Sequence, residues 1–322
     1  MQPEIAAAVE RLERANVIPS PTASFLFRVA RREIVSIRLE IRAALYAGIA
    51  LIAAGAGLFV KEHSRDIGPV AITLALSLAC AGSFAYVLRR APGFSWQRVP
   101  SPTLAFDYIL LLSVLLFGLD LAYVETQFRI FGPNWPYHLL LFSLICLAAA
   151  YRFDSAAVLS LALTSFAAWR GVAAKSPLDV LFASPTSRIR WNAILCGVLF
   201  AAGALWAARS GRKAHFEAVW ANLGLLLLFG GLLSGVLNGE NWRAWEVPLL
   251  VVSAAVLAAG LRFRRELPLA QAVLAGYVGA LKIALRPLHN EIAALAVLTV
   301  STIGVLAALL LLHRAVKARH AR

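Results

Sequence analysis

The chain has 322 residues, of which 60% are hydrophobic and 15% are charged, whereas soluble domains are about 45–50% apolar and about 25% charged. This composition excludes an ordinary water-soluble enzyme, a disordered chain, a coiled coil and a disulfide-stapled secreted module. The formal net charge is +14, but in a membrane protein the placement of charge over the loops matters more than its size. The sequence therefore predicts an all-α, multi-pass integral membrane protein.

Residues 1–42 are predicted to form a cytoplasmic, amphipathic helical arm. A first helix is expected over 3–15, and Ser20-Pro21 supplies the N-cap and first-turn proline of a second helix that continues into the membrane. Its apolar face is Leu26, Ala30, Ile34, Ile37 and Ile41, and its basic face is Arg28, Arg31, Arg32, Arg38 and Arg42. Such a helix is typical of an anchor on anionic lipid, and the alternative is a docking segment for a protein partner. The arm lacks a groove-reading motif and interleaved aromatic residues, so no nucleic-acid partner is expected.

Residues 43–313 are predicted to form a ten-span transmembrane domain, because a helix needs about 20 apolar residues to cross a bilayer. The expected spans are 43–60, 68–88, 103–124, 135–151, 154–173, 191–208, 216–237, 243–261, 267–285 and 291–312. With the N-terminus inside, the cytoplasmic segments hold 21 Lys and Arg residues and the outer loops hold 9. This excess predicts that both termini, including the basic tail 314–322, lie in the cytoplasm.

The outer loop at 170–190 departs from this charge pattern, since it carries four basic residues. It also contains two Ser-Pro pairs, which are start signals for short helices. One interpretation is an interfacial helix lying on the outer leaflet. The other is a basic flap over an outer cavity that receives an anion.

Two stretches of the chain share short matches in the same order, which predicts an internal repeat. Phe106-Asp107, Leu115–Gly118, Gly132–Trp135 and Arg152-Phe153 recur as Phe216-Glu217, Leu227–Gly230, Gly239–Trp242 and Arg262-Phe263, at offsets of 110, 112, 107 and 110. Spans two to five and six to nine would then be parallel four-helix repeats, and transporters often bind solutes where repeats meet. The alternative is chance similarity between Leu-, Phe- and Gly-rich segments. Small-residue spacings, as in Gly197 with Ala201 and Gly231 with Gly235, predict tight helix packing.

Charged residues near the span ends are the candidate functional residues. Asp107 and Glu217 occupy matched repeat positions at cytoplasmic ends, where a carboxylate either complements the helix dipole or belongs to a functional pair. The candidates on the outer side are Asp120, His138, Glu246, Lys282 and Arg286. Either these side chains reach water singly, or they converge on a polar cavity in which Asp120 or Glu246 pairs with Lys282.

Motifs for known chemistry are absent from the sequence. It contains no phosphate-binding glycine loop, no zinc-protease motif, no Gly-x-Ser-x-Gly motif and no paired cysteines. We therefore expect no catalytic residue, no metal site and no cofactor, and the balance is against an enzyme. The cysteines at 80, 146 and 196 lie in apolar runs and are expected to pack as small hydrophobic side chains.

Three stretches of the first half carry a family resemblance. They are Leu-Glu-Arg-Ala-Asn-Val-Ile-Pro-Ser at 12–20, the glycine-rich first span from Gly48 to Gly57, and the segment 151–171. Through them, residues 8–171 resemble domain-of-unknown-function family 2157, a group of predicted bacterial membrane proteins. The resemblance implies a protein of the bacterial inner membrane with no established activity.

The sequence supports three functional hypotheses in descending order. The first is binding or passage of a polar solute in a cavity between the repeats. The second is a non-transporting membrane scaffold or assembly partner, which uses the arm and helix faces to bind another protein or a second copy of the chain. The third is an integral-membrane enzyme that acts on lipid-linked substrates, with Asp120, His138 or Glu246 as acid or base.

Overall fold

The computed structural model describes residues 10–15, 17, 19, 20, 22–24, 26, 38–172, 187–238, 242–263, 265–285 and 291–320. Within these ranges the chain forms helices and no strand. Most of the predicted amphipathic arm, including residues 27–37 of its basic face, lies outside the described residues.

Each of the ten predicted spans coincides with one helix. The helices are α3 (Arg38–Ile67), α4 (Pro69–Arg90), α5 (Leu104–Phe128), α6 (Tyr137–Phe153), α7 (Ala156–Ala167), α9 (Ser187–Ser210), α10 (Glu217–Asn238), α11 (Trp242–Phe263), α12 (Glu266–Leu285) and α13 (Glu291–His320). Short 3-10 turns form η1 (Gly132–Asn134) and η3 (Ala214–Phe216), and α7 continues into the π-helical turn η2 (Ala168–Val172). The all-α, multi-pass prediction is confirmed.

Eight of these helices are long and apolar enough to cross a membrane by themselves. The two exceptions are α6, with 17 residues, and the apolar helix Ala156–Gly171 that combines α7 with most of η2. At a rise of about 1.5 Å per residue, α6 is about 25 Å long. Hydrocarbon of about 30 Å therefore has to thin locally around α6, or its end residues have to reach the interface. The tenth helix extends past the predicted span, so the basic tail begins as part of α13.

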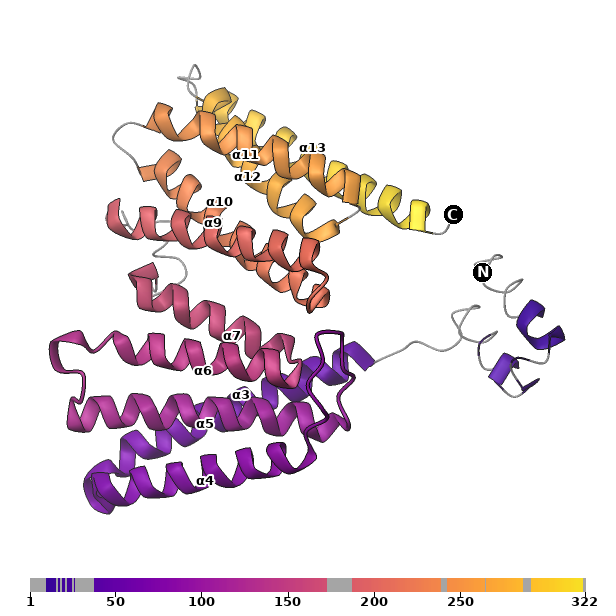
Figure 1. Cartoon of the computed structure of the whole chain (residues 1–322). Helices are drawn as coiled ribbons and strands as arrows, with labels where there is room; N and C mark the ends of the chain where they lie inside the picture. Colours follow the sequence, from indigo (N-terminus) through magenta and orange to yellow (C-terminus); the bar gives the residue numbers. More distant parts are fainter. Residues whose placement is uncertain are drawn as a thin grey trace.

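The helices lie side by side and run alternately in opposite directions (Figure 1). In the first half α4 packs on α5, and α6 packs on α7. In the second half α9 packs on α10, and α11 packs on α12. In each group the second helix also contacts the third, so α4–α7 and α9–α12 share one order of packing. Helices α3 and α13 pack against α5 and α12.

One buried core joins the two halves. Phe106, Leu110 and Leu159 of the first half belong to the same cluster as Phe200 of α9 and Phe216 of η3. Lipid tails are as apolar as these side chains, so close packing rather than exclusion of water stabilises such contacts inside a membrane.

Helices α9 and α10 approach each other closely, and this contact depends on glycine. A Cβ atom on Gly197 would lie 2.6 Å from the backbone nitrogen of Leu228, and one on Gly224 would lie 2.9 Å from that of Ala201. Gly231 meets the side chain of Ile194 in the same way, at 2.7 Å. The predicted tight packing at the small-residue spacings is confirmed.

Candidate functional site

A polar cavity of about 710 Å³ lies on the predicted outer side, where α5 turns back into α6. It is lined by Ala122, Glu125, Thr126, Arg129, Gly132, Pro133, Trp135 and His138. The turn forms because α5 ends at Arg129, which adopts a left-handed conformation (φ 49°) while its N–H donates to the carbonyl of Glu125. The following Gly132 also has a positive φ, of 52°, and Pro133 starts η1. The loop therefore folds over the end of α5 and leaves the cavity beneath it.

Two ionisable side chains of this cavity are buried. Glu125 is 6% exposed and His138 is 9% exposed. One carboxylate oxygen of Glu125 accepts a hydrogen bond from the N–H of Phe131 at 3.0 Å, which holds the loop against the helix. The Nδ1 atom of His138 contacts the carbonyl oxygen of Trp135. Because a carbonyl oxygen can only accept, Nδ1 is the donor in this contact, and in the tautomer that carries its proton on Nδ1 the Nε2 atom is an acceptor.

Trp135 and Arg129 add an aromatic face and a positive charge to the lining of the cavity. The indole ring of Trp135 stacks on the ring of His138, with 5.7 Å between the centroids. Arg129 is exposed and also lines the cavity. The site thus combines a carboxylate, an imidazole and an indole face with one guanidinium group.

The other predicted outer residues lie elsewhere in the fold. Asp120, on α5, accepts a hydrogen bond from the hydroxyl of Ser77 on α4 at 2.7 Å. Lys282, on α12, donates to the carbonyl oxygens of Val236 and Leu237 at the end of α10. Asp120, one of the two carboxylates predicted to pair with Lys282, therefore lies in the other half of the molecule. Glu246 is buried on α11, and Arg286 lies outside the described residues.

Asp107 and Glu217 both stand in the first turn of a helix, as their positions in the repeat predicted. Asp107 accepts a hydrogen bond from the hydroxyl of Ser101 at 2.6 Å. Glu217 forms an ion pair with Arg265 at 2.6 Å, which ties the start of α10 to the turn between α11 and α12. These positions favour the helix-dipole interpretation, and the two carboxylates have partners in different parts of the fold.

The loop predicted at 170–190 is partly helical. Helix α9 begins at Ser187, so Arg190 lies in its first turn rather than in a loop. Its buried guanidinium group lies within 3.4 Å of both oxygens of Ser234 and stands over the ring of Trp245 at 5.3 Å. Arg190 therefore packs against α10 and α11 and does not belong to a flap. The two Ser-Pro pairs lie in residues 173–186, outside the described residues.

A buried ion pair on the predicted cytoplasmic side was missed by the sequence reasoning. Asp154, in the turn between α6 and α7, lies 3.2 Å from the ammonium group of Lys213, and their side chains are 3% and 1% exposed. Asp154 also contacts His215 and accepts a hydrogen bond from the N–H of Val99. These contacts join three loops at the end of the molecule where α4 meets α5, α6 meets α7 and α9 meets α10 (Figure 1).

Comparison with known proteins supports the membrane assignment. Residues 8–159 match the family described as "Predicted membrane protein (DUF2157)". This match confirms the resemblance predicted from the sequence, and it covers the first half of the chain, including the whole α5–α6 cavity. No curated protein and no solved structure matches the chain significantly. The DUF2157 description names no activity, so the function has to be argued from the site.

Proposed function

We propose that this membrane protein binds a small polar solute in the α5–α6 cavity, and that the solute carries an ammonium group beside an acidic group. The observation that carries the proposal is the pair of buried side chains Glu125 and His138 in one cavity. Burial of a carboxylate is costly unless hydrogen-bond donors surround it. Phe131 supplies one such donor, whereas a carboxylate has about four acceptor positions. An ammonium ion would supply up to three more donors.

The rest of the lining supports the same class of ligand. The face of Trp135 attracts a cation, and the acceptor nitrogen of His138 adds a further partner. Arg129 is suited to the anionic end of the same molecule, because a guanidinium group binds carboxylate and phosphate in a planar, two-pronged manner. A volume of about 710 Å³ is ample for a small zwitterion with ordered water.

The same chemistry occurs in a free amino acid and in the headgroup of phosphatidylethanolamine, so the experiment has two arms. In the first arm, glycine and phosphoethanolamine are titrated calorimetrically against the full chain in nanodiscs made without phosphatidylethanolamine. Ethylamine and acetate, which each carry one of the two groups, are the reference ligands. In the second arm, phosphoethanolamine is titrated into nanodiscs that contain phosphatidylethanolamine. If the lipid headgroup is the ligand, binding of the soluble probe disappears in the second arm.

The variant Glu125→Gln keeps the shape of the side chain and removes its charge. We expect it to weaken binding of the zwitterion at least about ten-fold, which corresponds to about 1.4 kcal/mol. Glu62→Gln is the matched control, since Glu62 is an exposed carboxylate near the end of α3 and does not line the cavity. Equal binding by wild type and Glu125→Gln, or no binding of any probe in either arm, would refute the proposal.

A further inference from the structure

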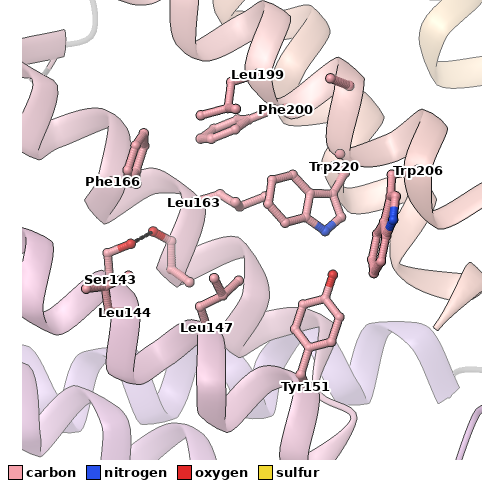
Figure 2. A pocket seen from close by; sticks show the side chains of 13 residues that line it. Ser143, Leu144, Leu147, Tyr151, Leu163, Phe166, Leu199, Phe200, Trp206 and Trp220 are labelled. Atoms are coloured by element: carbon pink, nitrogen blue, oxygen red, sulfur yellow. Dashed lines mark hydrogen bonds between the residues drawn. The ribbon is translucent and has the colours of Figure 1, made fainter. Parts of the chain in front are cut away.

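A second cavity lies where the two halves of the molecule meet. It has a volume of about 450 Å³ and lies between α6 and α7 on one side and α9 and α10 on the other (Figure 2). A cavity between the repeats is the place where the sequence predicted a polar solute. Its lining is instead almost entirely apolar, with Leu147, Leu163, Phe166, Phe200, Trp206 and Trp220 among the side chains that form it.

The few polar atoms of this cavity are either satisfied or gathered at one end. The hydroxyl of Ser143 donates to the carbonyl oxygen of Ala162 at 2.8 Å, so it is not available to a ligand. At the other end, the hydroxyl of Tyr151 points toward the indole of Trp220 (Figure 2). The indole nitrogen of Trp220 is buried and faces this hydroxyl, so the two polar groups lie together. The cavity is therefore an apolar slot with its polar groups, Tyr151 and Trp220, at one end.

The slot opens toward lipid rather than water. Leu144 on α6 and Leu199 and Trp206 on α9 line it and are also exposed on the outer surface of these helices. Helix α9 is long and apolar enough to cross a membrane, so these exposed side chains face the bilayer. A molecule that enters the slot from the side thus comes from among the lipid chains. If each chain carbon takes about the 30 Å³ of a liquid water molecule, the slot holds about fifteen of them.

This polar end of the slot lies at the membrane surface predicted to be cytoplasmic. Tyr151 is two residues before the end of α6, and Trp220 is in the first turn of α10. Tyr and Trp are characteristic of the depth at which lipid headgroups begin. Arg209 lies about one turn beyond Trp206 on the same face of α9, and it is exposed. The mouth of the slot is therefore basic.

From this arrangement we infer that the slot between the two halves binds one chain of an anionic, phosphate-bearing lipid of the predicted cytoplasmic leaflet. The chain fills the apolar slot, and the phosphate group lies near Trp220 and Arg209. Charge complementarity selects the anionic headgroup over a zwitterionic one. This site is separate from the α5–α6 cavity and does not depend on the function proposed for it.

Native mass spectrometry of the full chain, reconstituted with phosphatidylglycerol or phosphatidylcholine, measures the occupancy of the slot directly. Ala202→Trp fills the slot from α9, and Val198→Trp is the matched control, because Val198 is exposed on the same helix but does not line the slot. We expect wild type and Val198→Trp to retain one phosphatidylglycerol and Ala202→Trp to retain at least about five-fold less. Equal retention by the two variants, or equal retention of the two lipids by wild type, would overturn the inference.

A second measurement keeps the inference testable if Ala202→Trp does not fold. Phosphatidylglycerol with brominated chains quenches nearby tryptophan fluorescence, and Trp206 and Trp220 both line the slot. Arg209→Gln should lower the affinity for this quencher at least about three-fold. Arg89→Gln, at an exposed arginine in the last turn of α4, should leave the affinity unchanged. Quenching that is the same in wild type and Arg209→Gln, or that is as strong with brominated phosphatidylcholine, would also overturn it.

Discussion

Removal of the charge of Lys213 tests whether the buried ion pair holds the two halves of the molecule together. The variant Lys213→Met keeps most of the side-chain volume and leaves Asp154 without its ammonium partner at 3.2 Å. With an effective dielectric constant of about 20, two unit charges at this distance attract each other by about 5 kcal/mol. Desolvation of both charges offsets much of this attraction, so the intact pair contributes little net stability. Loss of Lys213 leaves the buried Asp154 with only His215 and the N–H of Val99 as partners, and removal of one member of a buried ion pair typically costs about 3–5 kcal/mol.

The assay is the fraction of detergent-solubilised protein that remains monodisperse in size-exclusion chromatography after heating. We expect a clearly lower melting temperature for Lys213→Met than for wild type. Arg98→Met is the control, because Arg98 is an exposed basic residue of the adjoining loop. The double variant Asp154→Asn/Lys213→Met should recover part of the loss, since it removes both charges together. A melting temperature of Lys213→Met equal to that of Arg98→Met, or a double variant whose loss equals the sum of the two single losses, would refute the reasoning.

Two further substitutions test other contacts by the same melting assay. Gly197→Leu should force α9 away from α10 and destabilise the protein by about 1–3 kcal/mol. Gly55→Leu should leave the stability unchanged, because a Cβ at Gly55 meets no atom within 4 Å. Equal melting temperatures of the two variants would contradict this packing. Arg190→Gln should lose its contacts with Ser234 and Trp245 and therefore melt at a lower temperature than wild type. Arg188→Gln, at an exposed position of the same turn, should melt at the wild-type temperature. A melting temperature of Arg188→Gln below that of Arg190→Gln would contradict the buried role of Arg190.

The helices were predictable because membrane hydrocarbon imposes a length on each apolar segment. The bilayer core offers no water to the backbone N–H and C=O groups of a run such as 243–261. These groups must therefore hydrogen-bond to one another, and a helix allows this within a single segment. The boundaries were less predictable where a helix continues into polar sequence. Helices α3 and α13 extend beyond their apolar runs, since the helical backbone continues into the polar residues on either side.

The candidate site was only partly predictable, because a charge pattern locates residues along a helix but does not pair them across helices. His138 was a predicted candidate and lines the α5–α6 cavity, whereas Glu125 was missed. Glu125 directly follows the predicted span 103–124, and an acidic residue at that position usually indicates a side chain that reaches water. Asp154 and Lys213 were missed for the same reason, since each resembles an ordinary loop charge and their contact depends on how α6–α7 docks on α9–α10.

The two halves share an order of packing but differ in polar contacts, and this difference bears on where function resides. At matched positions, Asp107 bonds to the loop before its own helix, whereas Glu217 reaches across to Arg265. An order of packing is fixed by apolar helix faces and survives many substitutions, while a polar contact is lost when either partner changes. If the halves arose as repeats, their common part is therefore the scaffold, and features that belong to one half are the places to look for specific binding. The α5–α6 cavity is such a feature, and it lies wholly within the DUF2157 match. The lipid slot instead needs both halves, so its occupant would report on their contact rather than on either half alone.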